Sequence, residues 1–205
     1  MLRIGLAGIA SKVQFTSQNI NYWPNGKYDA IISMPPFGLR MGMQTPPLFF
    51  NAGPTEDSEL IAPCRFLENT TDDGVCVAFV RTSLLYGESI KKRFRIWAIE
   101  HKILDTVILL PGNMLNGTNI QIACIILRKK PIHSEAVRMI DATGFYTNYK
   151  NRNLLEVGDL MEAYHADVEN ISRTVSYKEI EEHDFSWNIK EYFQKEQICP
   201  DGFSL

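Results

Sequence analysis

An apolar stretch that stops abruptly at Met34-Pro35-Pro36-Phe37 has the clearest potential for chemistry in this sequence. The residues leading up to Met34 are typical of a strand, and in open α/β sheets ligands bind at the carboxyl ends of the strands. The four side chains would therefore be presented where a ligand binds. A Pro-Pro-Phe sequence is equally common in surface turns, so by itself the segment is compatible with a binding site or with a plain turn.

The segments after Phe37 follow in a characteristic order. They are a helix within Glu59–Leu67, a strand within Gly74–Leu85, a helix and a strand within Arg95–Pro111 that end in Leu-Pro, and a closing hairpin within Asn116–Lys130. Because these segments follow Pro-Pro-Phe in this order, the sequence resembles the modification (M) subunit of type I restriction-modification systems, a family of adenine-N6 DNA methyltransferases. The resemblance covers Met1 to Lys130.

The resemblance implies a role for each of the four residues. Motif four of this family is Asn/Asp/Ser-Pro-Pro-Tyr/Phe/Trp, and the target adenine is flipped out of the duplex into a pocket. The first residue and the backbone carbonyl after it accept hydrogen bonds from the exocyclic amine, beside the methyl group of S-adenosylmethionine. The aromatic residue stacks on the base, a role that Phe37 suits. The alternative for Phe37 is a phenylalanine of the core or of a turn.

Met34 departs from this pattern. It stands where the motif needs a strong acceptor, and a thioether accepts hydrogen bonds only weakly. Ser33 is one residue too early, and neighbouring strand residues face opposite sides of a sheet. Losing a positioned polar group at a transition state costs about 2.7 to 4 kcal/mol, or a hundredfold to a thousandfold in rate. We therefore expect the catalytic side chain to be missing.

A second departure concerns the cofactor. As the resemblance implies, the family holds S-adenosylmethionine with a glycine-rich turn after its first strand and an acidic residue at the end of its second, both upstream of motif four. Thirty-three residues precede Met34, too few for two strands and their helices. Gly5 and Gly8 do not restore the motif, because no strand precedes them. The sequence therefore predicts a chain without the cofactor-binding half.

Alternating strand and helix patterns position these residues and predict an α/β fold. Strands are expected at Val13–Thr16, Ala30–Met34, Val75–Arg81, Thr106–Leu110 and Gln121–Arg128. Helices are expected at Glu59–Asn69, before a turn at Asp72-Asp73-Gly74, and at Glu88–His101, with Ile90, Phe94, Trp97 and Ala98 on its core face. The connection Pro111–Asn119 is too short for a crossover helix, so the strands that it joins should be antiparallel. The predicted fold is a truncated Rossmann-like methyltransferase sheet with a C-terminal antiparallel hairpin.

Beyond Lys130 the chain becomes more polar. We expect a short strand at Ala136–Asp141 and charged helices at Leu154–Tyr164 and Tyr177–Glu182. A weaker family similarity recurs at 176–193, around Trp187 and Tyr192. Residues 1–130 are thus predicted to form a partial methyltransferase domain, and residues 131–205 a small polar C-terminal extension packed on it.

The charge balance argues against tight DNA binding by this chain alone. There are 21 Lys and Arg against 24 Asp and Glu, a net charge of −3, whereas proteins that neutralise DNA phosphates are usually basic. Candidate phosphate contacts are Lys91, Lys92, Arg93, Arg95, Lys102 and residues 128–130, although such charges are more commonly just solvated. No metal site is expected, because His101, His133, His165 and His183 show no ligand spacing.

The cysteines and apolar runs indicate a cytoplasmic setting. Cys64, Cys76, Cys124 and Cys199 include no close pair, which argues against a zinc site or a disulfide framework and favours a reducing compartment. The longest apolar runs, 107–110 and 122–127, are far shorter than the roughly eighteen residues that a membrane span needs. The N-terminus does not resemble a secretory signal.

Two functions remain open. The first is part of an adenine-N6 DNA methyltransferase that contacts DNA within a larger complex, with specificity and restriction subunits or a missing N-terminal half as partners. The second is a non-catalytic remnant or interaction module of a restriction-modification complex. The family's strand order, 3-2-1-4-5-7-6, would leave Ala30–Met34 at an open edge. We expect that edge to be covered by Val13–Thr16, by a second copy in a homodimer or by a partner subunit.

The isolated chain should not bind S-adenosylmethionine appreciably, because both family elements that hold it lie upstream of motif four. Calorimetric titration is the measurement. A dissociation constant below about 100 μM, close to −5.5 kcal/mol, would contradict the prediction.

Overall fold

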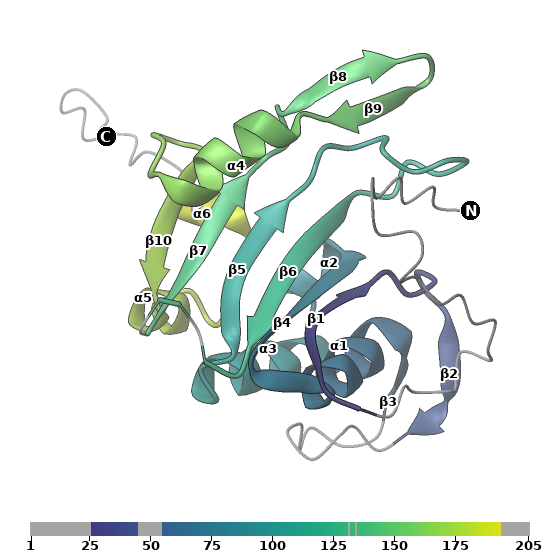
Figure 1. Cartoon of the computed structure of the whole chain (residues 1–205), viewed down its shortest axis with the longest axis vertical. Helices are drawn as coiled ribbons and strands as arrows, with labels where there is room; N and C mark the ends of the chain where they lie inside the picture. Colours follow the sequence, from purple (N-terminus) through teal and green to yellow (C-terminus); the bar gives the residue numbers. More distant parts are fainter. Residues whose placement is uncertain (1–25, 45–54, 131, 134, 194–205) are drawn as a thin grey trace, which may run out of the picture.

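Six strands form one mixed sheet in the part of the chain that the computed structural model describes, residues 26–44, 55–130, 132–133 and 135–193 (Figure 1). Their order across the sheet is β1-β4-β6-β5-β7-β10. The strands are β1 (Tyr28–Ser33), β4 (Thr70–Arg81), β5 (Leu104–Leu109), β6 (Ile122–Arg128), β7 (Ala136–Asp141) and β10 (Ser172–Ser176). The predicted α/β class is confirmed, and β1-β4-β6-β5 matches the order 4-5-7-6 that the resemblance implies.

The strand directions decide where the loops lie. β1 is parallel to β4 and β5 is parallel to β7, whereas β6 lies between β4 and β5 and is antiparallel to both. The predicted antiparallel pairing of β5 with β6 is thereby confirmed. β1, β4, β5 and β7 all run in one direction, so their carboxyl ends share one edge of the sheet, which we call the carboxyl edge.

The central strands are covered on both faces. Every residue of β5 is buried, and β6 is an apolar run, a pattern that requires a layer on each side of the sheet. The larger core cluster draws on α1 (Ser58–Glu68), α2 (Ser83–Tyr86), α3 (Ile90–Glu100), α5 (Tyr177–Glu182) and α6 (Ile189–Phe193). A second cluster on the opposite face includes residues of α4 (Val157–His165). None of the helices in the described ranges has the length and apolar character needed to cross a membrane.

β1 is an edge strand among the described elements, with β4 as its neighbour. It begins two residues before the expected Ala30 and ends at Ser33. Ile32 is 74% exposed, an unusual state for an isoleucine in a strand. The segment expected to cover this edge, Val13–Thr16, lies outside the described residues.

Two expectations for the middle of the chain need correction. The turn predicted at Asp72-Asp73-Gly74 is part of β4, whose pairing with β1 is irregular between Thr70 and Val75. A Cβ at Gly74 would lie 2.9 Å from the Tyr28 carbonyl oxygen, so glycine permits the close approach of the two strands there. Along the chain, an antiparallel ribbon of β2 (Arg40–Gln44) and β3 (Thr55–Asp57) comes between β1 and α1, and the sequence analysis did not predict it.

The C-terminal residues differ more from expectation. β7 and α5 are confirmed, but the helix predicted from Leu154 is wrong at its start, because a hairpin of β8 (Tyr146–Tyr149) and β9 (Arg152–Leu155) precedes α4. Its two-residue turn places Lys150 at φ 56, a conformation that lysine does not signal in a sequence. β7 and β10 extend the main sheet, so this part of the chain does more than pack on the sheet's surface.

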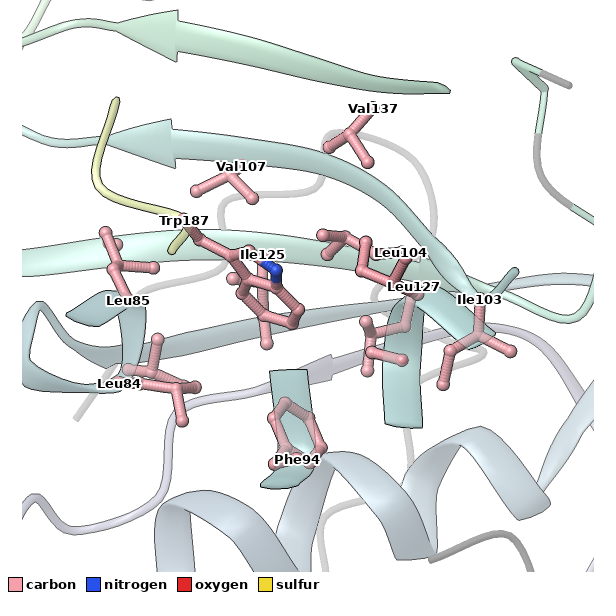
Figure 2. Packing of buried hydrophobic residues seen from close by; sticks show 14 of the residues in the cluster. Leu84, Leu85, Phe94, Ile103, Leu104, Val107, Ile125, Leu127, Val137 and Trp187 are labelled. Carbon is pink, nitrogen blue, oxygen red and sulfur yellow. The ribbon is translucent and has the colours of Figure 1, made fainter. Parts of the chain in front are cut away.

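The segment after α5 contacts the core through the packing of Trp187 and through a hydrogen bond from the buried guanidinium of Arg95. Trp187 is fully buried and meets Phe94 of α3 edge-on, with ring centroids 5.9 Å apart (Figure 2). Arg95, which the sequence offers as a candidate phosphate contact, is 1% exposed. It donates hydrogen bonds to the carbonyls of Phe185, Leu84 and Gly87 at 2.8, 2.9 and 2.7 Å. Burial lowers the pKa of its guanidinium, yet this group stays charged at neutral pH.

Replacing Arg95 with Met should destabilise the protein by about 3 kcal/mol, because several carbonyl groups would lose their donor. Urea-induced unfolding measures the change. Lys190→Met removes the same charge from an exposed site and should change the free energy of unfolding by less than about 0.5 kcal/mol. Equal effects of the two substitutions would contradict the anchoring role of Arg95.

Candidate functional site

Met34 is the first residue after β1, so it lies at the carboxyl edge. Its side chain is exposed, at 48%, whereas the neighbouring Ser33 is 3% exposed. The two side chains thus have different surroundings, as strand alternation predicts. The Ser33 hydroxyl therefore does not share the exposed surroundings of the Met34 side chain.

Residues 36–39 form a tight turn that presents Phe37. The Leu39 N–H donates to the Pro36 carbonyl at 3.3 Å, and Gly38 adopts φ +71, which a side chain would disfavour. Phe37 is half-buried and packs against the second core cluster. One part of its surface therefore supports the fold, and the rest is accessible to a ligand.

The carboxylate of Glu59, at the start of α1, holds this turn. Its side chain is only 4% exposed. Oε1 accepts a hydrogen bond from the Gly38 N–H at 3.1 Å, and Oε2 accepts one from the backbone N–H of Arg81 at 2.6 Å. The Arg81 guanidinium donates to the same carboxylate. Glu59 thus connects the turn after β1 with the end of β4.

Two neighbours of Glu59 complete the attachment. The Ser58 hydroxyl donates to the Pro36 carbonyl at 3.1 Å, and the Ser58 N–H donates to the Leu39 carbonyl at 3.3 Å. Asp57 caps α1 by accepting from the Glu59 N–H at 3.0 Å, and its carboxylate lies 3.8 Å from Arg81. Both ends of the turn are therefore tied to the first turn of α1.

The sequence interpretation missed Asp57, Glu59 and Arg81 as site residues. An aspartate before a helix with a glutamate in its first turn does signal a helix start. An arginine at the end of an apolar strand is a weaker sign. Neither pattern shows that the three side chains meet behind the turn at residues 36–39, because β1, α1 and β4 come together only in the folded sheet.

A cavity of about 550 Å³ opens beside this turn, on the side of β2 and β3. Its lining includes Gly38, Arg40, Asp57 and Arg81, so charges of both signs face it. A second cavity of about 340 Å³ lies between residues 167–173 and the end of α6, and none of its lining residues belongs to the turn. The first cavity therefore lies next to the segment for which the sequence predicts a binding site, Met34 to Phe37.

Comparison with known proteins decides the family. Residues 7–201 match the family described as N-6 DNA Methylase. The chain belongs to the N-6 DNA methylase family. The resemblance found from Pro-Pro-Phe and the segments after it is confirmed.

Within this family, the chain is similar to methyltransferase subunits of type I restriction-modification systems. The chain is 20% identical over 183 residues to the methylase subunit of the type I restriction enzyme MpnII from Mycoplasma pneumoniae, covering 82% of this chain and 34% of the relative. A type I methyltransferase subunit from Streptococcus thermophilus has the same fold, with a TM-score of 0.73 at 23% identity over 82% of this chain and 39% of its own. A structure of a type I restriction-modification system matches with a TM-score of 0.64 at 14% identity over 86% and 40%. The chain therefore spans between a third and two fifths of the length of these relatives.

The methyl donor of the N-6 DNA methylases is S-adenosylmethionine, which is the expected cofactor. Among the described residues, β1 has no neighbouring strand on its outer side. Gly5 and Gly8 lie outside the described residues.

Most of the basic residues considered for phosphate contact have partners within the protein. Lys91 donates to the Ser83 hydroxyl, Lys92 pairs with Asp184, and Lys102 pairs with Glu135. Arg128 lies 3.6 Å from Asp105, and Lys130 pairs with Asp73 at 3.0 Å. Together with the burial of Arg95, these contacts favour structural roles for this group of residues.

The histidines and cysteines have structural positions in the described ranges. His101 and His183 are the C-cap residues of α3 and α5. Cys64, Cys76 and Cys124 are buried free thiols, and burial raises the pKa of Cys76 and of Cys124 to about 12. Such thiols stay protonated and are poor nucleophiles. The described residues contain no cluster of His, Cys, Asp or Glu suited to a metal ion.

Glu59→Gln should loosen the turn at residues 36–39, because the charged hydrogen bonds between this side chain and Arg81 would be lost. We expect a stability loss of about 1.5 to 3 kcal/mol in urea and faster hydrogen exchange at the Gly38 amide. Glu56→Gln is the matched control, since its partner Arg40 is 86% exposed at 3.7 Å. If Gly38 exchanges at the same rate in both variants, Glu59 does not hold the turn.

Proposed function

We propose that this chain supplies the target-base half of an adenine-N6 DNA methyltransferase of the type I modification-subunit kind. In this proposal, the S-adenosylmethionine-binding half comes from a partner segment or polypeptide. The observation that carries it is the Pro35-Pro36-Phe37-Gly38 turn, held by Glu59 at the end of an edge strand. The outer side of that strand is where the family's strand order implies the cofactor half.

The roles of the turn residues follow from their positions. Phe37 would stack on the flipped adenine, since it is anchored on one side and accessible on the other. The Pro35 carbonyl would accept a hydrogen bond from the exocyclic amine, because the neighbouring Pro36 carbonyl already has two donors. Met34 would contribute only a weak acceptor, so transfer should be slow relative to a motif with Asn.

The outer side of β1 is the surface that a cofactor half would occupy. Ile32 and the backbone groups on that side favour an added strand. A strand of the partner half would pair there, in line with the family's order. A homodimer through Ala30–Met34 is the competing occupant of this edge.

A second function is supported by Met34 itself. A chain that keeps the fold and the turn but lacks the acceptor could be a non-catalytic scaffold for the specificity or restriction subunits of such a complex. Both functions involve DNA-modifying complexes, and we place the chain in the cytoplasm on that account and because of its free thiols.

Met34→Asn tests the first function. Alone, the variant should transfer no methyl group to DNA, since nothing in the described residues holds the donor. Mixed with a polypeptide that supplies a glycine-rich strand-turn-helix of this family, Met34→Asn should transfer about a hundredfold faster than the natural sequence. Incorporation of labelled methyl groups from S-adenosylmethionine into duplex DNA is the measurement.

Met161→Asn is the matched control, because Met161 lies on α4 and its exposure, 46%, is close to that of Met34. This variant should transfer at the natural rate. Transfer by the single chain would show that the half-enzyme proposal is wrong. A partner polypeptide could bind both S-adenosylmethionine and this chain. If no methyl transfer occurs with such a partner, either for the natural sequence or for Met34→Asn, the scaffold function is favoured.

A further inference from the structure

The β8–β9 hairpin projects from the sheet just beyond the end of β7 (Figure 1). All four residues of β8 are exposed, including Tyr146 at 39% and Tyr149 at 49%. A two-stranded hairpin alone is marginally stable in water, so an exposed one needs attachment to the body of a protein.

That attachment is present. The Asn153 N–H donates to the Asn113 carbonyl at 3.0 Å, and the Asn153 side chain donates to the Gly112 carbonyl at 2.8 Å. The Asn113 side chain returns a hydrogen bond to the Asn151 carbonyl at 3.1 Å. At the base of the hairpin, Phe145 and Leu155 pack against the second core cluster. The hairpin is therefore held in a defined position against the loop between β5 and β6.

The hairpin and this loop differ in charge from the rest of the chain. Residues 142–155 contain Lys150 and Arg152, and in the described part of the chain the one carboxylate bonded to the hairpin is that of Glu156, which follows β9 and accepts a hydrogen bond from the Thr147 hydroxyl. Residues 111–121 contain no charged side chain at all, in a chain of net charge −3. Within the described ranges neither Lys150 nor Arg152 has a carboxylate within 4.0 Å, in contrast to Lys92, Lys102 and Lys130. The Lys150 ammonium lies 5.3 Å from the centre of the Tyr149 ring.

The hairpin also lies on the side of the sheet where the chemistry is expected. It follows the carboxyl end of β7, and Met34 follows the carboxyl end of β1, at the same edge. Four strand spacings separate β1 from β7, about 19 Å. A duplex lying along this edge would span that distance in about six base pairs, at 3.4 Å per step.

We propose that the β8–β9 hairpin contacts the phosphate backbone of duplex DNA. Lys150 and Arg152 supply the charge, and the tyrosine hydroxyls and asparagine amides of the hairpin supply further donors to phosphate oxygens. The contacts are to the backbone, so they orient the duplex along the carboxyl edge without reading its sequence. The choice of DNA as partner rests on the proposed function, whereas the absence of an ion pair at Lys150 and Arg152 is a property of the described structure itself.

Titration of the isotope-labelled chain with a 20-base-pair duplex at low salt, followed by NMR, tests the inference. We expect amide shifts concentrated in residues 146–153 and 111–121. The double variant Lys150→Gln, Arg152→Gln should bind roughly fiftyfold more weakly at 0.1 M salt, and the slope of log K against log salt concentration should fall by about 1.8, for two lost phosphate contacts.

The matched control is Lys102→Gln, Lys130→Gln, which removes two exposed charges at the opposite edge of the sheet, before β5 and after β6. It should leave the salt slope unchanged. Absence of shifts in the hairpin, or equal slopes for the two double variants, would overturn the proposal. Hairpin shifts with polyglutamate but not with the duplex would also overturn it and indicate an acidic protein partner.

The readout needs neither S-adenosylmethionine nor methyl transfer. A failed methylation assay with a normal hairpin titration would therefore count against the half-enzyme alone. A normal methylation assay with unchanged DNA binding by the hairpin variant would count against the hairpin alone.

Discussion

The apolar character of β5 and β6 on both faces is the constraint from which the rest of this architecture follows. Strands without polar alternation are stable only at the centre of a sheet with a layer on each side. Placing β6 between β4 and β5 buries β5 completely and most of β6, and it leaves β1, β4, β5 and β7 running in one direction. Four connections are then forced to one edge. The turn at residues 36–39 and the β8–β9 hairpin both lie at the carboxyl edge because of that arrangement.

A buried carboxylate then determines where the turn at this edge sits. Glu59 accepts hydrogen bonds from Gly38 and from Arg81, two residues that are 43 positions apart in the chain. Its own position is set by Asp57, which begins α1. A turn at the end of an edge strand would otherwise be free to move, since β1 has a described neighbour on one side only. The tie to α1 and β4 replaces the support that a second neighbouring strand would give.

The combination of a well-held turn with a methionine at its first position is informative about function. Glu59 and Ser58 hold the turn that carries Phe37, whereas Met34 is a weaker acceptor than the residue that the family resemblance leads us to expect. A half-enzyme and a scaffold both require the turn's geometry, because it shapes the carboxyl edge. They differ in what Met34 does, and in what covers the outer side of β1.

The sequence by itself determined the α/β class, the strands β1, β4, β5, β6 and β7, the antiparallel closing pair and the family. Each of these depends on local periodicity or on residues that are contiguous in the chain, such as Pro35-Pro36-Phe37. Only the tertiary structure decided that Glu59 and Arg81 meet the turn, that Arg95 is buried and that residues 146–155 form a hairpin at the same edge as Met34. Those facts depend on which strands become neighbours, and pairing between distant segments leaves no signature in the order of the residues. An arginine has the same appearance in a sequence whether its guanidinium is solvated or, like that of Arg95, is bonded to three backbone carbonyls inside the protein.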